Sequence, residues 1–283
     1  VLHPIVADLD GDKQSEILVW RNRLAPNPND ILIFNHKGEL VRSIPLDAHP
    51  LQTYLSSYQY SPWPLLVTDI DSDGAPEIIA IESFSFVGAP YLSPFASLQV
   101  QVVTVLDRLG NVRPGFPVLL EGINESFIAA DLNRDGRKEI IIESSYQDSQ
   151  IKFIGQTHVD VHIISDDGTI IGHARSAPEK NRINLGELEE GSNPIVGNFD
   201  SDDDLEVAIF RNTIDSSSYP YFTDARNSVS IVNWDQFDNF SSAVPSFPGM
   251  LFGSAVPLDE DHDGIHEISL PLFPWDGISR VEH

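Results

Sequence analysis

The stretch Asp69-Ile70-Asp71-Ser72-Asp73-Gly74-Ala75-Pro76-Glu77 decides the fold, because the chain contains the same nine-residue pattern five times. The copies, called loops 1 to 5, occupy residues 8–16, 69–77, 131–139, 198–206 and 259–267. Their first residues are 61, 62, 67 and 61 residues apart, and short apolar runs flank them. One unit has therefore been duplicated, and units of this kind must stack on one another to bury their apolar faces.

Four strand signals recur within each repeat. The apolar run before each loop predicts a first strand, and the Ile/Val run after it predicts a second. A third signal ends in a tight polar turn and occurs at residues 31–34, 102–106, 159–164 and 228–232. A fourth follows that turn, as at residues 40–44, and no segment has a convincing helical period.

The chain is therefore predicted to be all-β, with four-stranded antiparallel blades arranged as a β-propeller. Residues 1–283 form one propeller domain or fragment in this interpretation, with four full repeats and a partial fifth. The repeats start near residues 4, 64, 127, 194 and 255.

The long insertions of the repeats fall on the side opposite the nine-residue loops. They are predicted connections between second and third strands or between fourth and first strands, at residues 21–29, 83–99, 212–227, 47–63 and 176–193. Loops gathered on one side of a rigid scaffold commonly carry binding residues, although these aromatic side chains could equally pack the loops down. The aromatic candidates for a ligand-binding face are Tyr54, Tyr58, Tyr60, Trp63, Phe86, Tyr91, Phe95, Tyr219, Tyr221 and Phe222.

The nine-residue loops have the chemistry of calcium sites, because Ca²⁺ takes six to eight oxygen ligands from carboxylates and carbonyls. We expect ligands from the side chains at positions 1, 3, 5 and 9 and from the backbone carbonyl at position 7. Gly at position 6 supplies the positive φ of a sharp turn. The predicted ligands of up to five Ca²⁺ ions are Asp8, Asp10, Asp12, Gln14, Glu16; Asp69, Asp71, Asp73, Ala75, Glu77; Asp131, Asn133, Asp135, Arg137, Glu139; Asn198, Asp200, Asp202, Asp204, Glu206; and Asp259, Asp261, Asp263, Ile265, Glu267.

The copies differ in how closely they match the calcium-binding pattern. Loop 4 has Asn198 at position 1 and Asp203 at position 6, and loop 1 has Lys13 at position 6. We therefore expect loops 2 and 5 to bind calcium most tightly and loop 4 most weakly. The alternative, that the loops are solvated Asp-Gly hairpins without metal, is harder to sustain for five copies in phase than for one.

Charge and composition narrow the function. The net charge of −26, with 18 of the 43 acidic side chains at these loop positions, argues against electrostatic binding of nucleic acid. The absence of cysteine excludes disulfides and thiolate metal sites, and no run is long enough to insert this segment into a membrane. The histidines are interpreted as surface or strand residues: His3, His36, His49, His158, His162, His173, His262 and His266.

The repeated pattern D-x-[DN]-x-D-G-x-x-[DE] resembles the FG-GAP/VCBS repeats of integrin-α-like propellers. Pro114-Gly115-Phe116-Pro117 also resembles the Gly-aromatic-Pro signature in the fourth strand of bacterial members. The resemblance implies calcium in the loops and a propeller that usually has seven blades. This chain has fewer repeats than seven blades need. The smaller number of blades would be accounted for by missing sequence, by a partner over the exposed edges or by an open arc, and we expect further blades or domains from a longer chain.

Two functions follow as expectations. The first is a non-enzymatic, calcium-stabilised binding or adhesion module, extracellular (secreted or at the cell surface), that recognises a protein or carbohydrate. The alternative is an accessory or catalytic domain of a secreted hydrolase or polysaccharide lyase. Acids held on a metal are poor proton donors, and no G-x-S-x-G, H-E-x-x-H or phosphate-binding glycine loop is present.

Overall fold

A computed structural model describes most of the chain. The described residues are 4–21, 29–46, 58–62, 65–87, 97–147, 157–175, 182–184, 194–200, 204–215, 225–233, 241–248, 250–251, 255–269 and 272–273. They contain strands, turns and bends but no helix, which confirms the all-β prediction. No helix within these residues is long and apolar enough to cross a membrane.

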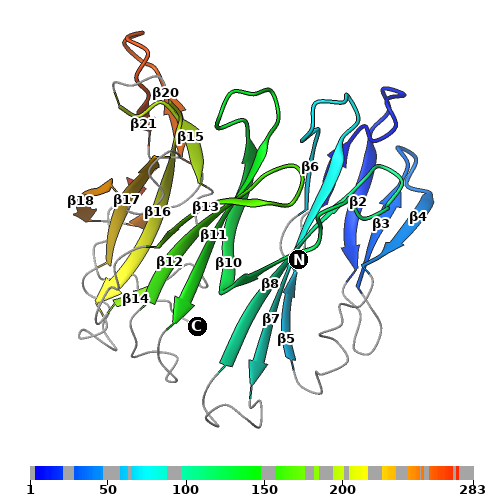
Figure 1. The fold of residues 1–283 in the computed structure, drawn as a ribbon, viewed down its shortest axis with the longest axis horizontal. Helices are drawn as coiled ribbons and strands as arrows, with labels where there is room; N and C mark the ends of the chain where they lie inside the picture. The colour runs from blue at the N-terminus through cyan, green and yellow to red at the C-terminus, as the bar shows by residue number, and fades with distance from the viewer. Residues whose placement is uncertain are drawn as a thin grey trace. The chain divides into compact units, whose positions relative to one another are not determined.

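The strands pair in sequence order into antiparallel sheets that follow the repeats. Sheet 1 contains β1 (Ile5–Ala7), β2 (Glu16–Arg21), β3 (Asp30–Phe34) and β4 (Leu40–Pro45). Sheet 2 contains β5 (Tyr58–Pro62), β6 (Leu66–Thr68), β7 (Glu77–Val87), β8 (Ser97–Leu106) and β9 (Val118–Glu121). Sheet 3 contains β10 (Ile123–Ala130), β11 (Glu139–Gln147), β12 (Thr157–Ile164) and β13 (Ile170–Arg175), and Figure 1 shows these four strands side by side.

Sheet 4 contains β14 (Arg182–Asn184), β15 (Ile195–Gly197), β16 (Glu206–Asp215), β17 (Ala225–Asn233) and β18 (Ser241–Pro248). In the fifth repeat, β20 (Val256–Leu258) pairs with β21 (Glu267–Ser269), and β19 (Met250–Leu251) pairs with β22 (Leu272–Phe273). The strands on either side of the five loops lie at the predicted positions, and in sheets 2, 3 and 4 the Ile/Val runs that follow the loops form buried strand centres.

The contacts between residues divide the chain into two compact units. The first contains Val1–Asn124, Gly136–Lys138 and Asp166–Thr169, and the second contains Glu125–Asp135, Glu139–Ser165 and Ile170–His283. In the first unit one apolar cluster joins Leu18 and Ile31 of sheet 1 to Ile78 of sheet 2. In the second unit another joins Ile141 and Val161 of sheet 3 to Val207 and Ile209 of sheet 4. Neighbouring sheets within a unit thus pack face to face, and each fully buried Ile contributes about 1.5–3 kcal/mol to stability.

The insertions predicted as long connections contain strand residues, so that prediction is corrected. β7 and β8 extend into residues 83–99, β16 and β17 extend into residues 212–227, and two other insertions contain added strands. β5 lies within residues 47–63 and pairs with β7, with Tyr58 opposite Phe86. β14 lies within residues 176–193 and pairs with β16. The added strands occupy the edge of the sheet beyond β6 and β15, where β7 and β16 would otherwise present unpaired backbone groups.

The turns between third and fourth strands make close contacts inside the first unit. Gly115 has φ +87°, and a Cβ on it would lie 1.8 Å from the carbonyl oxygen of Asp167 in the β12–β13 turn. A Cβ on Gly168 of that turn would lie 2.5 Å from the Gly115 carbonyl oxygen. Only glycine fits at both positions, and the contact fixes the chain segment that follows β8.

Candidate metal centres

The five acidic loops connect the first and second strands of their repeats, as predicted. Loop 1 joins β1 to β2, loop 2 joins β6 to β7, and loop 3 joins β10 to β11. Loop 4 joins β15 to β16, and loop 5 joins β20 to β21. Residues 201–203 of loop 4, with the predicted ligand Asp202, lie outside the described residues.

One hydrogen bond recurs in every loop. The Glu at position 9 accepts, through Oε2, the backbone N–H of position 2. The bonds are Leu9 to Glu16 (2.9 Å), Ile70 to Glu77 (3.0 Å), Leu132 to Glu139 (2.8 Å), Phe199 to Glu206 (2.6 Å) and Glu260 to Glu267 (2.9 Å). This hydrogen bond connects the first residue of the second strand to position 2 of the loop, so the carboxylate of that Glu lies beside the loop.

The acids at positions 1, 3 and 5 accept hydrogen bonds from backbone N–H groups of their own loop. In loop 2 the Asp69 Oδ2 accepts from the Gly74 N–H (2.9 Å), and Asp71 accepts from the Asp73 N–H (3.2 Å). Asp73 accepts from the Ala75 N–H (2.7 Å), and loop 5 repeats all three bonds with Asp259, Asp261 and Asp263 as acceptors. Local bonds from Asp side chains to the backbone are typical of tight turns, and here they leave one oxygen of each acid for other ligands.

The turn requires positive φ at two positions, and the sequence interpretation found only one. Position 6 has positive φ at Gly74, Gly136 and Gly264 as predicted, and Lys13 in loop 1 adopts φ +70° in the same place. Position 4 also has positive φ, at Gly11 and at the non-glycine residues Ser72, Arg134 and His262. The recurrence shows that the loop geometry, rather than the residue type, imposes this conformation.

Three loops bring acidic side chains close enough to share a cation. The clusters are Asp8, Asp10 and Glu16; Asp69, Asp71 and Glu77; and Asp259, Asp261 and Asp263, with ligand atoms within 4.8 Å of one another. In loops 2 and 5 the Oδ1 atoms of Asp69 and Asp259 are buried without a hydrogen-bond partner. A buried acceptor without a donor is costly, so these atoms fit a metal ligand set. The residues of the loops could hold a hard, oxygen-preferring ion.

The closing acids of loops 2 and 3 have raised pKa values. Burial raises the pKa of Glu139, and the charges of Asp135 and Asp131 add to this, although the Leu132 N–H opposes it. Burial also raises the pKa of Glu77, offset in part by the Ile70 N–H and Arg113. The charged form of such a carboxyl group is disfavoured. A bound cation would offset the burial and the repulsion between the acids, and would favour the charged form that ligates it.

Loop 2 already contains a cation from the protein. The Arg113 guanidinium bonds Asp71 Oδ2 through Nη2 (2.7 Å) and Glu77 Oε1 through Nη1 (2.9 Å). Burial alone would raise the pKa of Asp71, but bonds from Arg113 and from the Asp73 N–H lower it below its usual value. The sequence interpretation missed this residue.

The register of the strands would have revealed Arg113. It follows Val112, which pairs with Leu106, and its N–H bonds the Val105 carbonyl oxygen. The same place after the turn is taken by Val41 in sheet 1 and by Ile171 in sheet 3, both skipped in the pairing. Val41 lines a pocket of about 310 Å³ together with Asp10, Asp12 and Glu16 of loop 1. This position therefore lies beside the loop acids, and only sheet 2 of these three places a basic residue there.

Backbone bonds also link one loop to the next within each unit. The Lys138 N–H donates to the Ile70 carbonyl oxygen (2.8 Å), and Ser72 Oγ donates to the Gly136 carbonyl oxygen. In the second unit the His266 N–H donates to the Asn198 carbonyl oxygen (2.6 Å), and the Asn198 N–H donates to His266 Nδ1 (3.0 Å). In both pairs the residue at position 8 of one loop holds the beginning of the preceding loop.

Three of the ten candidate ligand-face aromatics lie in described strands. Tyr58 and Tyr60 lie in β5 and Phe86 lies in β7, at the end of that strand away from loop 2. The other seven candidates lie outside the described residues: Tyr54, Trp63, Tyr91, Phe95, Tyr219, Tyr221 and Phe222.

Comparison with known proteins adds little to this geometry. No family model matches the chain, and no curated protein matches it. A crystal structure of the rhamnogalacturonan lyase YesW is similar at 13% sequence identity with a TM-score of 0.42. The match covers 97% of this chain and 58% of that one, so the chain spans less than two thirds of the lyase.

Proposed function

We propose that the chain is a calcium-stabilised binding module built as part of a β-propeller of the FG-GAP/VCBS type. The observation that supports it is the loop geometry, in which all five closing Glu residues accept the same backbone bond. Solvated hairpins have no need of the same closing acid in all five loops, buried in loops 2, 3 and 4, whereas an oxygen cage for calcium does. The face-to-face packing of successive sheets within each unit is the packing that propeller blades require.

Calcium is the proposed ion because the donors are oxygen atoms from three or more side chains per loop. Mg²⁺ keeps several of its waters and demands octahedral geometry, so it should compete poorly. Calcium at millimolar concentration is available outside cells, and for this reason we propose an extracellular setting, either secreted or at the cell surface.

The recognition surface is proposed at the ends of the strands away from the loops. Phe86 lies nine positions after Glu77 in β7, about 30 Å at the usual rise per strand residue, which separates the aromatic end from loop 2. Aromatic faces stack well on sugars and anchor protein partners, so the proposed ligand is a carbohydrate or a protein. The acids of the metal loops are engaged by the backbone, and we propose no catalysis by them.

Thermal unfolding tests the calcium proposal. The melting temperature should rise with CaCl₂, change little with MgCl₂ and fall sharply in EDTA, because clustered carboxylates repel one another without a cation. An equal melting temperature in calcium and in EDTA would overturn the metal assignment. A glycan array and a pull-down with calcium-loaded protein test recognition separately. The absence of binding in both assays would contradict the binding role without contradicting the calcium sites.

A further inference from the structure

A second cluster of possible metal ligands lies in sheet 3, on strands rather than in an acidic loop. His162 on β12 is directly opposite His173 on β13, and Asp160 is directly opposite Arg175. Asp160 and His162 are two residues apart, so their side chains leave the same face of the sheet. The two imidazole rings are stacked, with centroids 4.6 Å apart and an interplanar angle of 9°.

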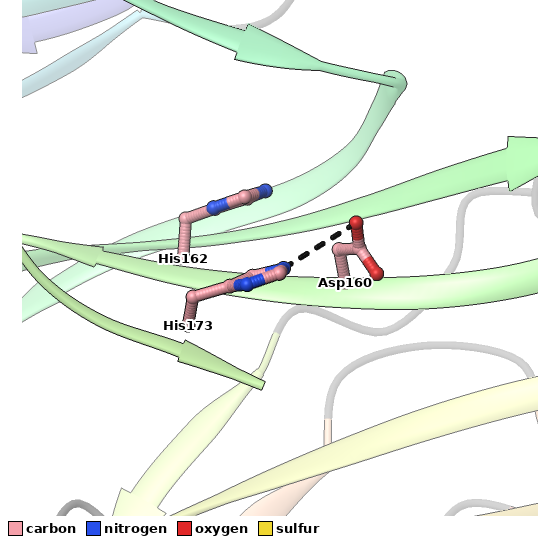
Figure 2. Close-up of side chains that lie close together, drawn as sticks. All are labelled: Asp160, His162 and His173. Carbon is pink, nitrogen blue, oxygen red and sulfur yellow. Dashed lines mark ion pairs between the residues drawn. The ribbon is translucent and has the colours of Figure 1, made fainter. Parts of the chain in front are cut away.

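The side chains converge on one side of the ring stack. Figure 2 shows both rings extending toward the side on which Asp160 lies. His173 Nε2 is 3.5 Å from Asp160 Oδ2, and one ligand atom from each of the three residues lies within 4.8 Å of the others. This is a two-nitrogen, one-oxygen donor set, unlike the all-oxygen sets of the loops.

His162 is the observation that points to a ligand. The residue is 8% exposed, and neither ring nitrogen has a hydrogen-bond partner. No protein donor uses a lone pair of the His162 ring, so its imidazole can offer one to a metal ion.

The two histidines are not needed by the repeat itself. In sheet 1 the same register places Leu32 opposite Ser43 where sheet 3 has His162 and His173, while Asp30 stands where sheet 3 has Asp160. Asp30 is bound by Arg21 and by Ser43 Oγ (2.6 Å). The buried Asp with its arginine thus recurs as part of the scaffold, and the histidine pair is specific to sheet 3.

We propose that Asp160, His162 and His173 form a site for a divalent transition metal that prefers imidazole, with zinc as the first candidate. Zinc takes nitrogen and carboxylate ligands at about 2.0–2.1 Å, which places tetrahedral ligand atoms about 3.3 Å apart. To ligate the same ion, the His173 ring must rotate out of the stack, because the nitrogen lone pairs of two parallel rings lie in separate planes, and its side chain is 43% exposed. Calcium and magnesium prefer oxygen ligands and belong in the loops.

Arg175 orients the carboxylate of this site. Its Nε donates to Asp160 Oδ1 (2.8 Å) and its Nη2 donates to Oδ2 (2.6 Å). A carboxylate has about four lone-pair positions, so Oδ2 keeps one for a metal while Arg175 fixes the plane of the group. Partners of this kind behind metal ligands typically contribute 10–100-fold to metal affinity.

Cobalt spectroscopy on the 283-residue chain in excess calcium tests the site, because calcium then occupies the oxygen loops. Tetrahedral cobalt(II) with nitrogen ligands should give an intense visible band that zinc removes. His173→Gln should abolish the band and raise the Kd for zinc by more than about tenfold. His36→Gln, an exposed histidine in the β3–β4 turn, is the matched control and should change neither.

Either of two results would overturn the proposal: no zinc binding in excess calcium, or zinc binding by His173→Gln as tight as by the unmodified chain. Chemical modification of the unmodified chain provides a readout that needs no variant. Zinc should protect His173 from acylation by diethyl pyrocarbonate, and calcium alone should not. Equal labelling of His173 with and without zinc would contradict the site even if the variant failed to fold.

Discussion

Loops 1 and 2 share one nine-residue template and most of their internal hydrogen bonds, apart from the bond from the Gly11 N–H to Asp8 Oδ1 in loop 1, yet they differ in what lies beside them. Loop 2 has Arg113 bound to Asp71 and Glu77. Loop 1 has Val41 in the matching place, at a pocket that its own acids line together with Arg42 and Arg108, for which no bond to those acids is described. The difference indicates that the candidate ligands within a loop would not decide its calcium affinity alone, because the segment between the third and fourth strands of the same sheet can supply a competing cation.

The sequence-based ranking of the loops considered only their own nine residues. By that ranking loop 2 is among the tightest sites. Arg113 neutralises two of its acids and must be displaced, or must share them, before a divalent ion binds. We therefore expect loop 2 to bind calcium more weakly than loop 5, where the described residues show no guanidinium bond to Asp259, Asp261 or Asp263.

The largest expected effect comes from the contact that positions Arg113. Gly115→Ala should cost about 3 kcal/mol of unfolding free energy, since overpacking against the Asp167 carbonyl adds to a positive φ. Gly38→Ala is the control, because Gly38 has φ +78° with open space around it and should cost only about 1 kcal/mol. Urea unfolding measures both, and equal losses would show that the close contact does not hold this segment.

Arg113→Val makes loop 2 resemble loop 1. Without calcium the variant should lose about 2 kcal/mol of stability, because the largely buried Asp71 and Glu77 lose their counter-charge. With calcium this loss should shrink, and the affinity of loop 2 should rise at least about tenfold, or about 1.4 kcal/mol. Urea unfolding with and without calcium measures stability, and the NMR shift of the Gly74 amide follows the loop. Weaker calcium binding in the variant would show that Arg113 supports the site instead of competing for it.

Val41→Arg is the reverse exchange in sheet 1. A guanidinium beside Asp10, Asp12 and Glu16 should weaken calcium binding at loop 1 by about tenfold, an effect of about 1.4 kcal/mol. The Gly11 amide reports this loop in the same titration. Val41→Gln, which adds polarity without charge, should leave the affinity unchanged, and a similar loss in both variants would mean that side-chain volume rather than charge is responsible.

The smallest effect concerns the turns that precede Val41 and Arg113. Asp107 accepts bonds from the Leu109 and Asn111 N–H groups, as Asn35 does from Lys37 and Glu39 in sheet 1. Burial would raise the pKa of Asp107, but bonds from Asn111, Leu109 and Gly110 lower it overall. Its stabilisation is therefore complete above the unfolded pKa of about 3.9 and disappears as pH falls through the lower folded value.

Asp107→Asn should remove this pH dependence, because the Asn turn of sheet 1 has no charge to lose. The expected difference is less than about 1 kcal/mol, since the carboxylate is largely solvated. Urea unfolding of calcium-free protein at pH 6 and pH 3 measures it. A steeper acid loss in the variant than in the unmodified chain would contradict the assignment.

The sequence predicted the strands well because each second strand is apolar at every position in its centre. Ile78, Ile79, Ala80 and Ile81 are fully buried, and such runs leave little ambiguity. The insertions were harder, since β5 and β14 form only by pairing with strands that follow them in sequence. Pairing between distant segments leaves no local signal for either strand.

The acidic loops were visible in the sequence because their candidate ligands lie within nine residues of one another. Arg113 and the His162–His173 pair were not, since each depends on cross-strand register. The histidine prediction was right that His162 and His173 lie on strands, but it treated the residues one at a time. Aligning the repeats on the turn after the third strand would have placed both features, and the bulge in that turn sets the register.

The backbone bonds at position 8 have a consequence for how the loops fill. Lys138 holds Ile70, and His266 holds Asn198, so each bond joins the closing end of one loop to the opening of its predecessor. A cation that orders one member of such a pair has already reduced the entropy that the other must lose. Calcium should accordingly enter these pairs cooperatively, with a titration steeper than that of independent sites.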